Sequence, residues 1–320
     1  MTSYNDSAFV VLLLTMVLSP NKEEFARPYT AQEFYALEEK VRTSSLEHLP
    51  KLLHIDVSGL MKCLSMSEDE AYRLYTLLHR DVLIMRTLEL AWKVSSDISA
   101  LYTDTYPTRI RRKLGKFAPT YFYTNGDASL LNSSCVAILG ISGVKTTPEI
   151  RNAVETIVKA ATEQGYTIVT GGEPGVSRVA ANTVAECGGR LLDILGGDME
   201  IHMNEPPIDE LLRQNRAEIL SLEHPQAVLT IPHAVKRNRF LLSIADAAFI
   251  FNTDGKRGEQ EALQNHTCNW IYAWAKSACN QPLLMKGAIA LNDVDLLDFA
   301  SLARRWGDAK TEQISLFDFI

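Results

Sequence analysis

From Cys135 onward the chain alternates short apolar segments with longer amphipathic segments. The apolar segments, read as strands, are residues 135–139, 166–170, 190–195, 227–231, 247–251 and 270–274. The segments between them, read as helices, are residues 148–164, 176–187, 208–221, 236–245 and 258–265. Strands that are apolar throughout are typical of parallel sheets with helices on both faces. The pattern therefore predicts a doubly wound, mostly parallel α/β sheet of the Rossmann-like type over residues 135–290.

The remaining sequence predicts three further parts. Residues 1–98 lack strand alternation and predict a helical N-terminal domain, with a helix start at Ser67. Residues 99–134 are rich in Tyr, Pro, Thr and Gly and predict an irregular connector. Residues 291–320 predict a last helix, roughly 293–306, followed by a C-terminal tail.

The apolar run at residues 9–18 is too short to cross a bilayer, which takes about 20 residues. No basic residue precedes it, as one would in a signal peptide. We therefore expect a buried first helix and a cytoplasmic protein without membrane contact. The five cysteines form no CxxC pair and the histidines are scattered, so neither a disulfide framework nor a metal site is predicted.

The net charge of −7 means that any nucleic-acid binding must come from a local basic patch. The densest basic run lies in the connector and is free of acidic residues. It consists of Arg109, Arg111, Arg112, Lys113 and Lys116. This run is either a solvated helix face or a phosphate contact.

Three glycine-containing loops follow predicted strands, at residues 140–147, 170–177 and 252–258. Glycine allows a close approach to an anion, and the helix after each loop points free N–H groups to the same place. Because the carboxyl ends of parallel strands meet at one edge, we expect a phosphate site there. Its candidate residues are Lys145, Gly171, Gly172, Gly175, Ser177, Lys256, Arg257 and Gly258. The loop at residues 170–177 is the most specific of the three, and a plain tight turn is its alternative.

A fourth candidate is the run Lys236, Arg237, Asn238 and Arg239, placed at the start of a predicted helix. The planar fork of an arginine donates two hydrogen bonds to a phosphate. Residues 231–260 contain five basic and three acidic residues, a balance of +2 within a chain of −7. The run therefore predicts phosphate binding, with a solvated helix end as the alternative.

In their order along the chain, VAILG at residue 136, GYTIVTGGEPGVS at residue 165 and KRNRF at residue 236 resemble the bacterial DNA-processing protein DprA (Smf) family. The resemblance covers residues 102–290. It implies a homodimer without a cofactor or known catalysis, which binds single-stranded DNA and loads a RecA-type recombinase. By the same resemblance, Arg237 and Arg239 hold DNA phosphates, and Lys145 stands in for the family's arginine.

A rival interpretation comes from the lysine-decarboxylase-like phosphoribohydrolases, which share a wider superfamily with DprA. Residues 258–261 (GEQE) partly resemble their GT-x-E motif. A carboxylate near a ribose can stabilise an oxocarbenium-like transition state or activate water. In this alternative the protein binds a nucleotide or hydrolyses its N-glycosidic bond, with Glu261 and Arg239 as catalytic residues.

The C-terminal residues Gln313, Ser315, Leu316 and Phe317 resemble the pentapeptide by which bacterial DNA polymerases and repair proteins dock on the replicative sliding clamp. The glutamine amide suits a polar pocket, and Leu316 and Phe317 suit an apolar one. The tail either docks on a clamp or folds back on the domain. A pure adaptor acting through this tail is a third hypothesis, and the sequence leaves open whether the pathway is transformation, repair or defence.

Overall fold

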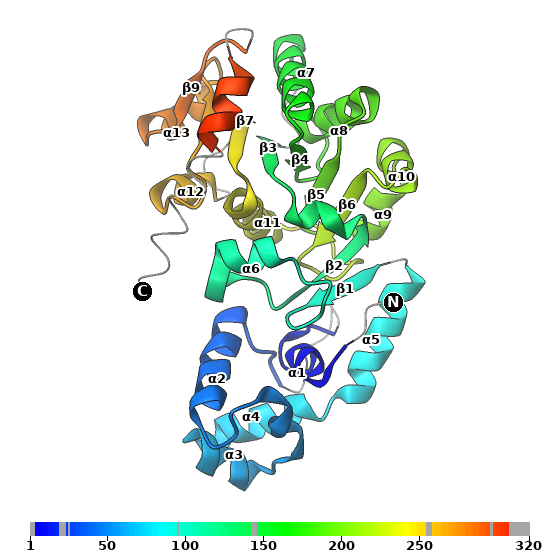
Figure 1. The fold of residues 1–320 in the computed structure, drawn as a ribbon, viewed down its shortest axis with the longest axis vertical. Coiled ribbons are helices and arrows are strands. Elements are labelled where there is room, and N and C mark those ends of the chain that lie inside the picture. Colours follow the sequence, from blue (N-terminus) through cyan, green and yellow to red (C-terminus); the bar gives the residue numbers. More distant parts are fainter. Residues whose placement is uncertain are drawn as a thin grey trace. The chain divides into compact units, whose positions relative to one another are not determined.

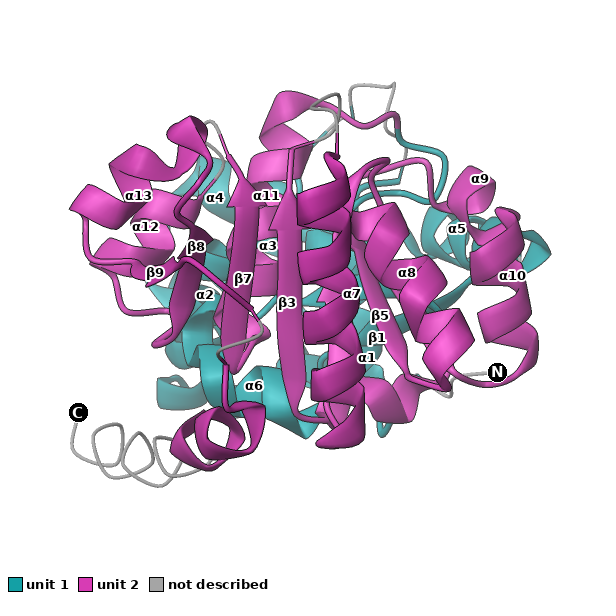
Figure 2. Ribbon diagram, turned by 90° about the horizontal axis from the view of Figure 1, so that it is seen from above, with its two compact units in different colours: residues 1–125, 221–227 teal, residues 126–220, 228–320 magenta. Residues whose placement is uncertain are grey.

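The computed structural model describes residues 4–18, 24, 26–94, 96–141, 146–253, 258–294 and 297–306. It contains two compact units (Figures 1 and 2). The first comprises residues 1–125 and 221–227, and the second comprises residues 126–220 and 228–320. The candidate site lies in the second unit.

The first unit is mainly helical, as predicted for the N-terminal part of the chain. Its α-helices are α1 Asp6–Thr15, α2 Ala31–Thr43, α3 Val57–Leu64, α4 Glu68–Leu78, α5 Asp81–Lys93 and α6 Thr108–Leu114. Side chains of Asn5, Thr30, Asp56 and Ser67 cap the first four of these α-helices by accepting hydrogen bonds from backbone N–H groups of the first turn.

The first helix is buried, as expected, and no described helix has the length and apolar character needed to span a membrane. Arg80 binds the C-terminal end of this first helix, α1. The Arg80 guanidinium donates to the carbonyls of Leu13 (2.7 Å) and Met16 (2.7 Å) and pairs with Glu24. These charge-assisted bonds satisfy carbonyls that a helix end leaves without intrahelical partners.

The segment predicted as an irregular connector contains regular structure. It includes α6 and the strand β2 Tyr121–Gly126, which pairs antiparallel with β1 Asp97–Ala100. These elements are too short, and too interrupted by proline and glycine, to show a clear periodicity in the sequence. The prediction that this segment has no regular secondary structure was therefore wrong.

The second unit contains the predicted doubly wound sheet. Its described strands run in the order β6-β5-β4-β3-β7-β8-β9. They are β3 Cys135–Gly140, β4 Thr167–Thr170, β5 Leu191–Leu195, β6 Ala217–Ser221, β7 Ala247–Asn252, β8 Ile271–Trp274 and β9 Ile289–Leu291. Pairing is parallel from β5 through β4, β3, β7 and β8 to β9. Helices α7 Pro148–Glu163 and α8 Val176–Cys187 lie on one face, and α11 Ile231–Ile244 on the other (Figures 1 and 2).

The order in which the chain adds strands to the sheet reverses at β3. The chain adds β4, β5 and β6 on one side of β3 and then returns to place β7 on its other side. Ligands of doubly wound folds bind at such a switch point, beyond the carboxyl ends of the strands. The topology therefore places the candidate site above β3 and β7.

Two of the predicted elements were wrong. Residues 227–231 are not a strand, because Thr230 caps α11 and Pro232 sits in its first turn, which is a strong helix start. The missing strand is β6, which was assigned to the end of a predicted helix over residues 208–221. That helix, α10 Pro206–Arg213, ends early because Asn215 takes a left-handed conformation (φ 52°) that turns the chain into β6.

Smaller helices complete the second unit. They are α9 Met199–Met203, α12 Glu259–Gln264 and α13 Gln281–Met285. Residues 299–306 form a last helical segment, within the helix predicted at about 293–306. Its Trp306 is buried against four aromatic rings. They are Phe299 (5.5 Å between centroids), Tyr166 (5.6 Å), Phe249 (6.2 Å) and Tyr272 (6.3 Å).

We predict that Trp306→Ala lowers the free energy of unfolding by about 3–5 kcal/mol, because the substitution leaves a cavity among these rings. Urea denaturation of the full chain, followed by circular dichroism, measures the change. Arg304→Ala on the exposed side of the same segment is the control and should cost less than about 0.5 kcal/mol. Equal effects of the two substitutions would mean that the segment is not part of the core.

Candidate functional site

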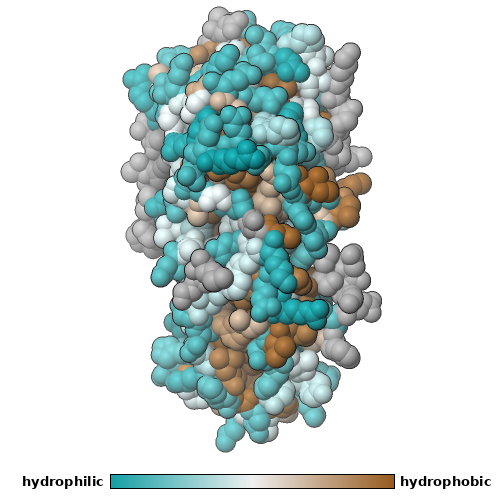
Figure 3. Space-filling view, turned by 90° about the vertical axis from the view of Figure 1, so that its right-hand side faces the viewer, coloured by the Kyte–Doolittle hydropathy of each residue, from teal (hydrophilic) through white to brown (hydrophobic). Residues whose placement is uncertain are grey.

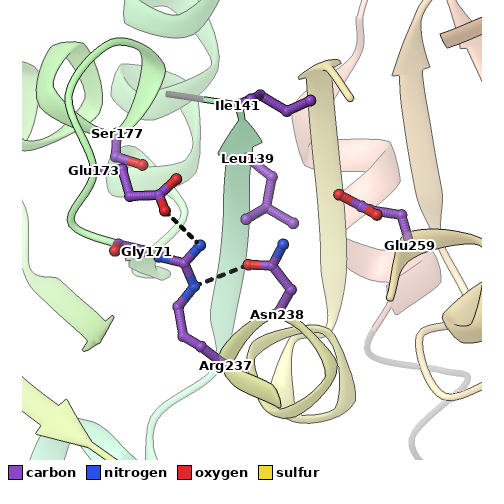
Figure 4. Close-up of a pocket in the computed structure, with 9 residues that line it drawn as sticks. Leu139, Ile141, Gly171, Glu173, Ser177, Arg237, Asn238 and Glu259 are labelled. Atoms are coloured by element: carbon purple, nitrogen blue, oxygen red, sulfur yellow. Dashed lines mark hydrogen bonds and ion pairs between the residues drawn. The ribbon is translucent and has the colours of Figure 1, made fainter. Parts of the chain in front are cut away.

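A small pocket opens at the carboxyl edge of the sheet, at the predicted switch point (Figure 4). The end of β3, the loop after β4, α11 and the start of α12 each contribute to it. It is lined by Leu139, Gly140, Ile141, Gly171, Glu173, Ser177, Arg237, Asn238 and Glu259. The structure thus brings one glycine loop and part of the RNR motif together.

The loop between β4 and α8 depends on its glycines. Gly172 (φ 71°) and Gly175 (φ 105°) adopt backbone conformations that other residues rarely tolerate. At Gly171 a Cβ atom would lie 2.5 Å from the Nη1 atom of Arg237. This glycine is therefore required by the close packing of Arg237, independently of any ligand.

Arg237 is buried, with 3% of its surface exposed. Its Nη1 donates to the carbonyl of Gly171 (2.6 Å) and its Nε donates to Oδ1 of Asn238 (2.9 Å). Its Nη2 lies 3.2 Å from Oε1 of Glu173. The guanidinium thus joins α11 to the loop after β4, and its hydrogen-bonding fork is directed to the protein.

The other two basic residues of the run are exposed. Lys236 lies on the solvent side of α11, and Nε of Arg239 forms a 2.6 Å ion pair with Oε2 of Glu261. Gly258 (φ 98°) packs beside this pair, since a Cβ there would lie 3.0 Å from Cγ of Arg239. Residues two positions apart on a helix point in nearly opposite directions. The RNR motif is therefore divided between the interior and the surface.

The pocket contains two buried carboxylates, Glu173 and Glu259. Glu259 is the first residue of α12, and its Oε1 accepts a 2.9 Å hydrogen bond from the hydroxyl of Thr253. Among the described residues, the buried Oε1 of Glu173 has the ion pair with Arg237 but no hydrogen bond. Two carboxylates against one guanidinium give the lining a formal charge of −1. Such a lining favours hydrogen-bond donors over a phosphate.

The catalytic role was assigned from the sequence to Glu261 and not to Glu259. Glu261 lies two residues further along α12, and it is turned outward to Arg239. The available signal was the position of Glu259, directly after a glycine that ends a loop following a strand. Glu261 was selected because it matches the sequence spacing of the GT-x-E motif. That spacing does not show which side of the helix faces the pocket.

A buried polar network supports the glycine loop from behind. The N–H of Gly172 donates to Oγ1 of Thr170 (3.0 Å), whose hydroxyl donates to Asp193 on β5. The ring of His202 lies between the carboxylates of Asp193 and Glu205 and contacts both. Nε2 lies 2.8 Å from Oδ2 of Asp193, and Nδ1 lies 3.2 Å from Oε2 of Glu205. The network ties the loop to the neighbouring strand and to α9, so the loop is held in one conformation. No partner of His202 or Glu205 was predicted from the sequence.

Several predicted site residues lie outside the described residues. They are Lys145, Lys256, Arg257, Gln313, Ser315, Leu316 and Phe317. The basic run of residues 109–116 belongs to the first unit, where Arg109 is buried and Arg111 lies over the ring of Tyr102 (5.2 Å). Within the described ranges, no group of three or more His, Cys, Asp or Glu side chains could hold a metal ion.

The fold and the pocket define a doubly wound α/β protein with a small pocket at the topological switch point. The model of the family named DNA recombination-mediator protein A matches residues 97–288, more than half of the chain. The chain therefore belongs to the DNA recombination-mediator protein A family, as its resemblance to DprA indicated.

Solved structures of this family share the fold. DNA processing protein A from Streptococcus pneumoniae is 16% identical with a TM-score of 0.53, and the match covers 83% of this chain and 96% of that one. DNA processing protein A from Helicobacter pylori, described for its single-stranded DNA binding mode, is 18% identical with a TM-score of 0.52. That match covers 65% of this chain and 96% of that one. No match was found among curated proteins.

We predict strong coupling between Arg237 and Glu173. Replacing Arg237 alone with methionine leaves a buried carboxylate uncompensated and should cost about 3–5 kcal/mol of stability. Adding Glu173→Gln should recover a large part of this loss, because the charge left behind is removed. Urea denaturation of the two single variants and the double variant gives the coupling energy.

The exposed pair Arg239 and Glu261 provides the matched control. Arg239→Met with Glu261→Gln should show a coupling below about 1 kcal/mol, since solvent screens an exposed pair. Additive effects at Arg237 and Glu173 would mean that the two side chains do not act as a buried pair.

Proposed function

We propose that the protein binds single-stranded DNA and acts in DNA processing or recombination. The observation that supports this most is the match of the DNA recombination-mediator family over residues 97–288, together with glycine loops and exposed cations near the switch point. The Helicobacter pylori relative, whose structure concerns single-stranded DNA binding, supports the same function. The proposal keeps the sequence-based assignment of the carboxyl edge as the binding surface.

The exposed cations are the residues we assign to DNA phosphates. Lys236 and Arg239 can reach a phosphate at little desolvation cost. Lys145, Lys256 and Arg257, which lie outside the described residues, follow β3 and β7 in the sequence. Arg237 could reach one only by giving up its bonds to Gly171, Asn238 and Glu173. In the proposal Arg237 therefore shapes the pocket, together with Gly171, Gly172, Gly175, Ser177 and Gly258.

The partners remain proposals based on the family resemblance. They are a second copy of the chain, a RecA-type recombinase and, through Gln313, Ser315, Leu316 and Phe317, a replicative sliding clamp in the cytoplasm. Trp306, the last residue that the structure describes, is buried and lies seven residues before Gln313.

The DNA proposal predicts salt-dependent binding without sequence preference. Lys236→Ala with Arg239→Ala should weaken binding and lower the slope of log K against log salt by about 1.4, because two single-strand phosphate contacts are lost. Fluorescence anisotropy with labelled oligonucleotides over a salt series measures both quantities. Lys159→Ala, on the surface of α7 about three turns from the carboxyl edge, is the matched control. An unchanged slope in the double variant would reject the assigned phosphate contacts.

A second candidate function is nucleotide binding, or hydrolysis of an N-glycosidic bond. The observation that favours it is the buried pair of carboxylates, Glu173 and Glu259, in the pocket. In doubly wound folds an acidic side chain accepts hydrogen bonds from ribose hydroxyls, and paired carboxylates are the usual catalysts of glycosidic cleavage. Within this candidate we assign the chemistry to Glu259, because Glu261 is only half-buried and is paired with Arg239.

The second candidate predicts that the protein releases free base from nucleoside 5′-monophosphates and that Glu259→Gln removes at least about 99% of this activity. Glu261→Gln, two residues away, should leave most of it. Chromatography of the bases released from the four ribonucleotides and four deoxyribonucleotides is the measurement. If no base is released by the unaltered protein, the hydrolase is rejected and the DNA proposal is unaffected.

A further inference from the structure

The segment that leads into α11 exposes apolar side chains to solvent. It contains the apolar run of residues 227–231, whose composition predicts a buried strand. In the structure Val228 is 70% exposed and Ile231 is 71% exposed. Pro232, which follows in the first turn of α11, is exposed as well. Neighbouring apolar side chains that stay in contact with water are typical of an interaction site.

The backbone of this segment is fixed by hydrogen bonds. The N–H of Leu229 donates to Oδ2 of Asp198 (3.3 Å), and Nδ1 of His233 lies 3.1 Å from the carbonyl oxygen of Val228. Thr230 caps α11, because its hydroxyl oxygen accepts a 3.3 Å hydrogen bond from the N–H of His233. The segment therefore holds its apolar side chains in a defined position at the surface.

The segment lies at the carboxyl edge of the sheet, beside the loop that follows β5. Asp198, which binds the N–H of Leu229, comes three residues after the end of β5. It also begins α9, in which Ile201 is 68% exposed. On the side of the molecule where α9 lies in Figure 1, Figure 3 shows apolar surface among hydrophilic side chains. The edge that carries the pocket therefore also carries exposed apolar groups.

Two cations follow on the exposed face of the same helix. Pro232, Lys236 and Arg239 stand at positions i, i+4 and i+7, so they share one face of α11. A rise of about 1.5 Å per residue places Lys236 about 6 Å and Arg239 about 10 Å beyond Pro232 along the helix axis. Exposed cations next to exposed apolar groups match a polymer with an anionic backbone and apolar ring faces. Single-stranded DNA is such a polymer.

We propose that Val228, Ile231 and Pro232 contact the bases of single-stranded DNA, while Lys236 and Arg239 bind its phosphates. Isoleucine and proline are among the apolar side chains that proteins insert between neighbouring bases. Contact with the face of a base needs no hydrogen bond, so it is available to every base. The inference rests on the DNA proposal and deepens it, because it names the groups that touch the bases.

The proposed contacts also favour a single strand over a duplex. In a duplex the base faces are stacked on one another and are not accessible to a side chain without unstacking. The phosphates of a duplex remain accessible to Lys236 and Arg239. The apolar segment therefore supplies the difference in affinity between the two forms of DNA, and the cations supply the part that they share.

The test separates base contacts from phosphate contacts. Val228→Ala with Ile231→Ala should weaken binding of a single-stranded oligonucleotide about fivefold or more, because apolar contact area is lost. The slope of log K against log salt should stay unchanged, since no phosphate contact is removed. An oligonucleotide of the same length made of abasic sites should bind the double variant as well as it binds the unaltered protein. Fluorescence anisotropy measures all three quantities.

A variant with a gain of affinity complements the loss. Ile231→Phe should tighten single-strand binding severalfold, because an aromatic ring stacks on a base better than an aliphatic chain does. Its affinity for a duplex should not change. Met285→Ala, at a position on α13 that is 80% exposed, is the matched control and should leave binding unchanged. Circular dichroism shows whether these surface variants are folded.

Two outcomes would overturn the base contacts alone. One is a double variant that binds single strands as tightly as the unaltered protein does, which would assign the apolar segment to another partner. The other is an equal loss of affinity for the abasic oligonucleotide, which would mean that the apolar side chains only position the cations. An unaltered protein that does not bind single strands would reject the DNA proposal, and the base contacts with it.

Discussion

The arrangement of the candidate site depends on one buried cation, the guanidinium of Arg237. It is bound at once to a backbone carbonyl of the glycine loop, to the neighbouring Asn238 and to the carboxylate of Glu173. A buried charge is tolerated only when such partners compensate its lost hydration. Gly171 leaves the space the guanidinium occupies, and the network of Thr170, Asp193 and His202 holds the loop against it. The pocket therefore keeps its shape without a ligand.

This pairing also determines where charge is available to a ligand. Inside the pocket Arg237 is matched by Glu173, and Glu259 adds a further negative charge. Outside it, Lys236 and Arg239 are exposed on the same helix. Phosphates are favoured at these exposed cations, whereas the interior favours groups that donate hydrogen bonds, such as sugar hydroxyls or base amino groups. Both candidate functions place phosphates at the exposed cations and other groups in the pocket. The groups that enter the pocket therefore distinguish the two functions better than the phosphates do.

The fold was predictable because its signal extends over many residues. The apolar strands β3, β4, β5 and β7 and the long helices α7 and α8 were located from periodicity alone, and the carboxyl edge followed from the topology of parallel sheets. The failures are local. The strand β6 was lost because a single left-handed Asn215 ends the helix before it, and residues 227–231 are an apolar run that precedes a capped helix. A short apolar run does not by itself show whether it forms a strand or precedes a helix.

The site was harder to predict than the fold, because the direction of a side chain is not visible in a motif. Arg237 and Arg239 stand in one RNR motif, yet the rotation of about 200° between them sends one to the interior and the other to solvent. The same rotation separates Glu259 from Glu261 on α12. The contact that decides the direction of Arg237 comes from Glu173, far away in the sequence, and the contact of Glu259 comes from Thr253, at the end of β7. A motif thus locates the helix that carries the function, and the tertiary packing decides which of its residues a ligand can touch.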